Sequence, residues 1–229
     1  GADVVVHSAT KYLGGHCDLL AGVIVTKSAK STETLYKTRC ALGLGAGSME
    51  AWLLLRSLRT LSIRVRQQSQ TTARLVALLE SYRQGAITTE QSPDEDSLSL
   101  GRHIVAVQHA TLQFASSSSS SAAAAAPNAC RSFDVAKQHP EGFGAVFAIC
   151  FATKEQALFV ARHLKLHRFA TSLGGVESLV DWRFGFDSTA DPSLLRISVG
   201  LEDYVDLAND WKQALLALDA NEIQMRLEY

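Results

Sequence analysis

The chain has 229 residues with 22 basic and 23 acidic side chains, and a net charge of −1 gives no overall field that would favour nucleic acid or an anionic membrane surface. No run approaches the roughly 18 apolar residues of a membrane-spanning helix, so we expect no membrane partner. The four cysteines are scattered without a CxxC pattern, which argues against a metal site and favours a reduced, cytoplasmic protein.

Residues 3–16 combine a strand pattern with a single lysine. The β-branched residues 4–6 suit a short buried strand, and the polar side chains of Ser8, Thr10 and Lys11 follow before a pair of glycines. Burial favours the uncharged form of an amine, which can then attack a carbonyl carbon, and hydroxyl groups can bind phosphate oxygens. From these residues alone, the alternative is an ordinary exposed loop lysine.

The next part of the chain predicts a second strand and two helices. Residues 19–27 suit another buried strand, residues 32–40 a short helix, and residues 48–81 one long helix with Ser48 as its N-cap and Gly85 as its stop. A helix of this length would join two parts of a fold. We interpret its arginines as a solvated face or as subunit contacts: Arg56, Arg59, Arg64 and Arg66.

The second half of the chain alternates strand and helix patterns. The serine and alanine run at 116–126 cannot bury apolar surface, and we interpret it as a disordered insertion near 115–127 without a function. The alternation around it predicts an α/β fold. In chain order we predict a loop over 86–103, a strand over 104–107, a strand from Gly142, a helix over 154–166 and a C-terminal helix capped by Asp203.

Two later stretches carry residues that packing alone does not explain. Residues 172–179 begin Ser-Leu-Gly-Gly, and residues 194–202 form an apolar strand interrupted by Arg196. A guanidinium gives a planar, two-point grip on a carboxylate, so Arg196 is a candidate anion-binding residue. Strand alternation leaves the alternative open that Arg196 points from a solvated face.

Three motifs resemble one known family, and together they span nearly the whole chain. They are Ser-Ala-Thr-Lys-Tyr-Leu-Gly-Gly-His at 8–16, Ser-Leu-Gly-Gly at 172–175 and Arg-Ile-Ser-Val-Gly-Leu-Glu at 196–202. They are similar to the motifs of the Cys/Met-metabolism enzymes that depend on pyridoxal 5′-phosphate (PLP), which include cystathionine γ-synthase, the cystathionine β- and γ-lyases and methionine γ-lyase. The resemblance covers only the later half of such an enzyme.

The resemblance implies a role for each candidate residue. Lys11 would form a Schiff base with PLP, Ser8 and Thr10 would hold the cofactor phosphate, and Arg196 with Ser172 would bind the α-carboxylate of the substrate. PLP acts as an electron sink, and the protein binds, orients and tunes it. A P-loop is a poor alternative, because Lys11 precedes its glycines instead of following a glycine loop.

The implied fold is a truncated PLP-dependent transferase-like α/β fold of the aspartate aminotransferase type (fold type I). Residues 1–60 would end the large PLP-binding domain, residues 48–84 would form the inter-domain helix and residues 85–229 the C-terminal domain. The chain starts at Gly1 without an initiator Met or a signal peptide, directly before a strand pattern, so we expect it to be the later part of a longer chain.

The implied function is transsulfuration, in which the C–S bond of cystathionine or a related sulfur amino acid is cleaved or formed. The motifs do not separate β-elimination, γ-elimination and γ-replacement. The resemblance further implies a cytoplasmic homo-oligomer, a dimer of dimers, with a small amino acid as substrate. The alternative is a catalytically incomplete remnant, because the phosphate-binding glycine turn, the aromatic ring that stacks on the cofactor, the aspartate for its ring nitrogen and a tyrosine–arginine pair from a neighbouring subunit would all precede Gly1.

Overall fold

The computed structural model describes residues 1–85, 100–112, 137 and 139–227. The predicted Ser/Ala insertion and residues 86–99 of the loop predicted over 86–103 lie outside these residues. Within the described part of the chain, no helix has the length and apolar character needed to cross a membrane.

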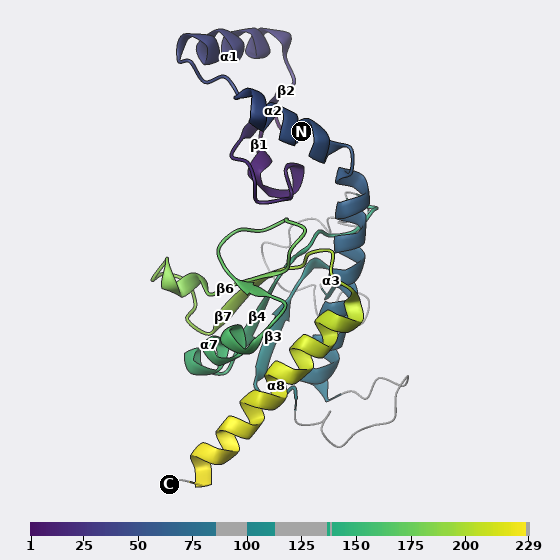
Figure 1. The fold of residues 1–229 in the computed structure, drawn as a ribbon, viewed down its shortest axis with the longest axis vertical. Coiled ribbons are helices and arrows are strands. Elements are labelled where there is room, and N and C mark those ends of the chain that lie inside the picture. The colour runs from purple at the N-terminus through teal and green to yellow at the C-terminus, as the bar shows by residue number, and fades with distance from the viewer. Residues whose placement is uncertain (86–99, 113–136, 138, 228–229) are drawn as a thin grey trace, which may run out of the picture.

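The chain forms a small two-stranded unit followed by a larger sheet with helices (Figure 1). In the first unit, β1 pairs antiparallel with β2, and in the second the strand order is β3-β4-β7-β6-β5 with only the β5–β6 pair parallel. The element bounds in chain order are β1 Val4–Ser8, η1 Ala9–Leu13, β2 Gly22–Thr26, α1 Ala29–Ala41, α2 Ser48–Leu58, α3 Leu61–Gln84, β3 Ile104–Gln108, β4 Val146–Phe151, α7 Lys154–His163, β5 Arg168–Phe169, β6 Leu179–Asp181, η3 Arg183–Gly185, β7 Leu194–Ser198 and α8 Tyr204–Leu227.

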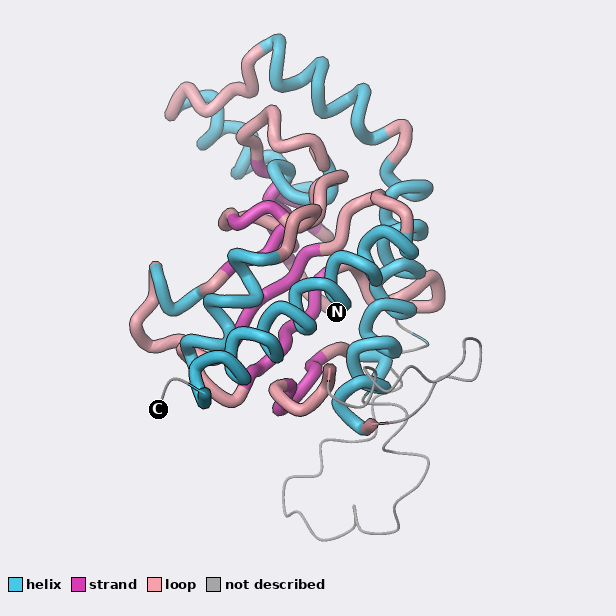
Figure 2. The backbone as a smooth tube through the Cα atoms, turned by 60° about the horizontal axis from the view of Figure 1, so that its bottom comes forward, coloured by secondary structure: helices cyan, strands magenta, loops and turns pink. Residues whose placement is uncertain are grey.

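The hydrophobic core lies between the five-stranded sheet and the helices α3, α7 and α8. Strand alternation sends Leu195 and Ile197 of β7 into this core, where both are fully buried. The apolar stripe of α8 packs on the same face, with Trp211 and Leu215 fully buried. Figure 2 shows the α8 helix lying across the strands. The other face of the sheet is therefore left for polar side chains such as Arg196.

Most of the predicted elements of the C-terminal part are confirmed. The strand expected at 104–107 is β3, the strand after Gly142 is β4, and the helix expected at 154–166 is α7, which ends earlier, at His163. Asp203 caps α8, and its carboxylate accepts a hydrogen bond from the Val205 amide at 2.7 Å.

The two N-terminal strands form as predicted, but the prediction that they are buried is wrong. All five residues of β1 are exposed, and Val6 has 70% of its surface accessible. The strand predicted over 19–27 is β2, in which Ile24 and Val25 are also exposed. The physical reason is that the two strands pair only with each other among the described residues, and no second layer covers their apolar side chains.

The prediction of one continuous helix over 48–81 is also wrong in detail. The helix is broken at Arg59 and Thr60 into α2 and α3, and the N-cap of α2 is Gly47, not Ser48. Gly85 ends α3 in a left-handed conformation with φ of 62°, as the sequence predicts. Figure 1 shows α3 running from the two-stranded unit along the five-stranded sheet. The division of the chain into domains stays a prediction.

Candidate active site

Lys11 lies in the short turn η1 that directly follows β1. The turn is closed by the Gly14 amide, which donates to the Ala9 carbonyl, and by the Gly15 amide, which donates to the Lys11 carbonyl, both at 2.7 Å. Lys11 itself departs from helical geometry, with φ of −85° and ψ of −126°, and its side chain is partly buried. The sequence expectation of a lysine just past the end of a strand is thus confirmed.

Ser172 joins Lys11 to Arg196. The Lys11 Nζ atom donates to Ser172 Oγ at 3.1 Å, and the Arg196 Nη2 atom donates to the Ser172 carbonyl at 3.1 Å. Ser172 has φ of +136°, a backbone conformation that residues other than glycine rarely adopt. Such strain persists only where surrounding contacts impose it. Three predicted site residues, distant in sequence, therefore meet at one point.

Neighbouring parts of the motifs hold Ser172 in place. The Gly174 amide donates to Ser198 Oγ at 2.8 Å, and the Val176 amide donates to the Gly15 carbonyl at 2.9 Å. The buried side chain of Gln68, from α3, donates to the carbonyls of Gly175 at 2.6 Å and Val199 at 3.1 Å. Hydrogen bonds thus join the three sequence motifs to one another, and Ser198 is one of the motif residues that form them.

Arg64 fixes the lysine turn to the break between α2 and α3. Arg64 is 4% exposed, and its guanidinium donates to the carbonyls of Tyr12 at 3.0 Å, Leu13 at 3.4 Å and Ser57 at 3.1 Å. A Cβ atom at Gly15 would overlap Arg64 Nη1, so this close approach requires glycine. The prediction that Arg64 belongs to a solvated face or to subunit contacts is wrong, because it satisfies buried carbonyls at the helix break.

Tyr12 connects the lysine turn to the five-stranded sheet. Its hydroxyl accepts a hydrogen bond from the Ala145 amide at 2.9 Å. Burial raises the pKa of Tyr12 above the usual value of 10.0, and this hydrogen bond offsets part of the rise. Tyr12 therefore stays a neutral phenol that anchors the turn beside Lys11.

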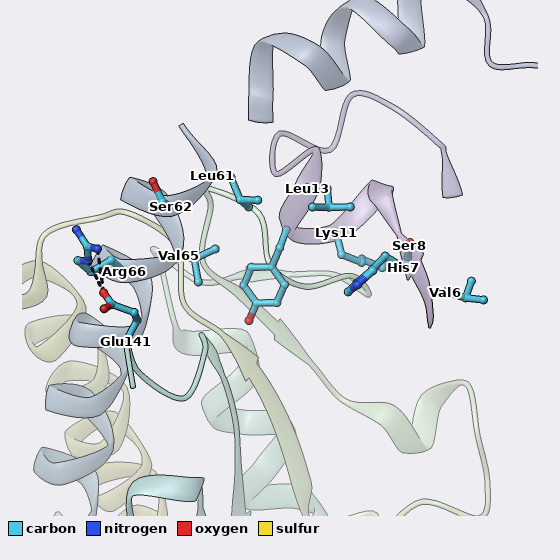
Figure 3. A pocket seen from close by; sticks show the side chains of 11 residues that line it. Val6, His7, Ser8, Lys11, Leu13, Leu61, Ser62, Val65, Arg66 and Glu141 are labelled. Atoms are coloured by element: carbon cyan, nitrogen blue, oxygen red, sulfur yellow. Dashed lines mark hydrogen bonds and ion pairs between the residues drawn. The ribbon is translucent and has the colours of Figure 1, made fainter. Parts of the chain in front are cut away.

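Two hollows lie beside the turn that carries Lys11. The first has a volume of about 590 Å³, and Figure 3 shows Lys11, Ser8 and His7 on one wall and residues of α3, among them Val65, on the other. The second, of about 680 Å³, is lined by Thr10 and Ser172 among others. Ser8 and Thr10, predicted to bind one phosphate, thus line different hollows. The Thr10 Oγ1 atom accepts from the Ala21 amide at 3.3 Å, which leaves its own O–H free to donate.

Sequence reasoning did not identify several residues that hold the site. Asp181 forms an ion pair with Arg196, with 2.7 Å between Oδ2 and Nη2, and Gln68, Arg64 and Tyr12 make the contacts above. A signal for two of them exists, because Arg64 and Gln68 have the four-residue spacing of one helix face, which continues into the buried Leu75 and Leu79. No comparable signal marks Asp181, since its role depends on strand register.

Comparison with known proteins gives one consistent result. The family model described as "Cys/Met metabolism PLP-dependent enzyme" matches residues 1–90 and 122–216. Cystathionine gamma-lyase of Bacillus subtilis (strain 168) is 32% identical, with 94% of this chain and 51% of the relative covered, and that of Saccharomyces cerevisiae is 34% identical, with 94% and 50% covered. Cystathionine gamma-synthase/O-acetylhomoserine (thiol)-lyase of Bacillus subtilis (strain 168) is 31% identical, with 94% and 47% covered.

The solved structures agree with the sequence relatives. The crystal structure of cystathionine gamma-lyase from yeast superimposes with a TM-score of 0.74 at 30% identity, over 96% of this chain and 51% of that one. The predicted fold class, a truncated PLP-dependent transferase-like fold of type I, is confirmed, and the chain spans about half the length of the curated relatives it matches. The chain belongs to the family of PLP-dependent enzymes of Cys/Met metabolism.

Proposed function

We propose that this chain carries the lysine and the carboxylate-binding residues of a PLP-dependent transsulfuration enzyme, which cleaves or forms the C–S bond of cystathionine or a related sulfur amino acid. The observation that carries the proposal is the position of Ser172, hydrogen-bonded through its hydroxyl to Lys11 and through its carbonyl to Arg196. The names of the relatives, cystathionine lyases and synthases, support this substrate class.

The residues around Lys11 fit a cofactor that carries an aldehyde and a phosphate. The partly buried amine lines a hollow next to a hydroxyl, that of Ser8, and the Thr10 hydroxyl has an unused donor on the other side of the turn. Lys11 would hold the cofactor covalently, and Ser8, in the same hollow, would donate to its phosphate. For Thr10 to donate to the same phosphate, as the sequence predicts, the turn would have to move, because Thr10 lines the other hollow. When bound, PLP supplies an electron sink for negative charge that develops at the substrate Cα.

Three side chains of the site would then position the substrate or transfer protons. Arg196 binds the α-carboxylate of the amino acid and so fixes which bond at Cα is oriented for cleavage. Lys11 Nζ, once released, takes the Cα proton and would donate a proton to a departing thiolate, or accept the proton of an arriving thiol when the C–S bond is formed. Ser172 Oγ, at 3.1 Å from Nζ, holds the amine on the side of the carboxylate site during this transfer.

The test is a PLP titration of the chain followed by reduction with borohydride. We expect a visible absorption band in the wild type and, after reduction, a cofactor adduct on the peptide that contains Lys11. Lys11→Ala should lose both the band and the adduct, whereas Lys30→Ala, at an exposed lysine of α1, should keep them. An adduct that maps to another lysine, or a normal band in Lys11→Ala, would refute the assignment.

The reaction type needs a product assay on cystathionine. Pyruvate indicates β-elimination, 2-oxobutyrate indicates γ-elimination, and a new thioether from an activated homoserine indicates γ-replacement. We also propose that the enzyme acts as a cytoplasmic homo-oligomer, a dimer of dimers, and sedimentation velocity would measure that assembly.

Two observations favour the alternative of a catalytically incomplete chain. The apolar side chains of β1 and β2 are exposed, and the chain spans about half the length of its relatives. If the chain is incomplete, PLP produces no absorption band with it and cystathionine is not turned over. The titration described above therefore separates the two proposals before any product is measured.

A further inference from the structure

The register of the sheet places Asp181 directly opposite Arg196. In the antiparallel pair of β6 and β7, the two residues are partners, so their side chains leave the sheet on the same face. The Arg196 Nη2 atom lies 2.7 Å from Asp181 Oδ2. The Asp181 side chain is 2% exposed, against 23% for that of Arg196, so the carboxylate sits behind the guanidinium and away from solvent.

Within the described part of the chain, the polar contacts of Arg196 all involve its Nη2 atom. The Nη2 atom donates a hydrogen bond to the Ser172 carbonyl at 3.1 Å and forms the ion pair with Asp181 Oδ2 at 2.7 Å. Among the described residues no partner is found for Nε, which is buried. These two contacts fix the plane of the guanidinium, and the Nη1 atom, which has no polar partner among the described residues, stays available to a ligand.

The charges around Asp181 leave a single positive charge uncompensated. Arg183 also points to Oδ2 of Asp181, with its Nη1 atom at 3.4 Å, and its side chain is 37% exposed. Two guanidinium groups therefore share one buried carboxylate. Without Asp181 the two guanidinium groups would repel each other, and Arg196 could turn toward solvent. With Asp181 the three side chains have a net charge of +1, which one bound carboxylate would neutralise.

We propose that Asp181 is a positioning residue for Arg196, which locks the guanidinium in the orientation that receives the α-carboxylate of the substrate. The inference that a carboxylate is received rests on the proposed function, while the locking of Arg196 does not. Asp181 touches neither the substrate nor the cofactor and acts only through Arg196.

The first test measures the mobility of Arg196 without any ligand. In ¹⁵N-arginine NMR spectra of the chain, with Arg196→Lys to assign the signal, we expect two distinct Nη resonances for Arg196, because the ion pair prevents rotation about the Nε–Cζ bond. Asp181→Asn should merge them, whereas Asp206→Asn, at an exposed position in the first turn of α8, should not. Merged signals in the wild type, or distinct signals in Asp181→Asn, would overturn the proposal.

The second test measures recognition of the carboxylate in the PLP-loaded chain. L-Alanine and L-alaninamide, which differ in the carboxylate alone, are titrated against the absorption band of the cofactor. We expect Asp181→Asn to weaken alanine binding by about tenfold and to leave alaninamide binding unchanged, as for a lost charge-assisted contact. Equal losses for both ligands would mean a structural role only and would refute the proposal. If the wild type shows no band, the proposed function fails, and the NMR result still decides whether Asp181 locks Arg196.

Discussion

Arg64 is buried and stabilises the fold, although the sequence predicts that it lies on a solvated face or in a subunit contact. Burial lowers the pKa of Arg64 below its usual value, and the hydrogen bonds that its guanidinium donates to three carbonyls and to Thr60 Oγ1 stabilise the charged group in the interior. Two of these carbonyls, of Tyr12 and Leu13, follow Lys11 directly. The orientation of the lysine turn therefore depends on a side chain of α3.

Arg64→Lys should lower the free energy of unfolding by about 2–4 kcal/mol. A lysine ammonium is a single point donor, and it cannot reach acceptors on both sides of the helix break as the guanidinium does. Urea denaturation measures the change, and Arg59→Lys, at an exposed arginine of the same break, should alter stability by less than about 0.5 kcal/mol. Equal effects of the two substitutions would show that Arg64 is not an anchor.

Ser172 offers a way to separate backbone strain from side-chain chemistry. Both Ser172→Gly and Ser172→Ala remove the hydroxyl that binds Lys11, but only glycine relieves the φ of +136°. We therefore expect Ser172→Gly to be more stable than Ser172→Ala by about 1 kcal/mol in urea denaturation. Equal stability of the two variants would mean that the positive φ carries no strain.

At the scale of elements, the sequence predicts the type of each element better than its surroundings. The valines of β1 predict a strand correctly, but β-branched residues do not tell whether another layer covers that strand. The helix break at Arg59 and Thr60 carries no glycine or proline, so periodicity alone extends the helix across it. What the pattern lacks in both cases is the tertiary environment: β1 has no covering layer, and the helix break packs on the lysine turn, to which Arg64 donates hydrogen bonds.

The segment between α7 and β5 is tied to α8 by a buried carboxylate. Burial raises the pKa of Asp210, but hydrogen bonds from His167 and from the amides of Lys165 and Leu166 outweigh it and lower the pKa from 3.8 to about 2. A carboxylate with a depressed pKa stabilises the folded state above the unfolded value, and the contribution is lost as the pH falls through the folded value.

Asp210 should therefore contribute about 2 kcal/mol of stability that is complete above pH 4 and disappears between about pH 4 and pH 2. The measurement is the free energy of unfolding against pH for the wild type and Asp210→Asn. The difference between the two proteins should shrink across this window. A difference that stays constant down to pH 2 would contradict the depressed pKa.

For the whole molecule, the motifs identify the residues that meet but not the framework that brings them together. Lys11, Ser172 and Arg196 lie in three separate motifs, and each carries a chemical group that a sequence can reveal. The partner of Arg196 is Asp181, and that pairing follows from the register of β6 against β7, which no local pattern encodes. The roles of the motif residues toward cofactor and substrate stay predictions.

The two units of the molecule differ in how their strands are covered, and this difference should govern their local stability. The β1–β2 pair has two strands with exposed apolar side chains, whereas β4 and β7 are central strands of a five-stranded sheet whose core face is fully buried (Figure 1). A two-stranded sheet without a covering layer is marginal in water. Its amides should therefore open without unfolding of the rest of the chain.

Amide hydrogen exchange followed by mass spectrometry tests this difference within one sample. Peptides that contain β1 and β2 should exchange about a hundredfold faster than peptides that contain β4 and β7, because only the latter require global opening. Val6→Thr, which lowers the exposed apolar surface of β1 without removing a β-branched side chain, should leave the exchange of β4 and β7 unchanged. Equal protection of both units would show that a further contact, such as a second copy of the chain, covers the first sheet in solution.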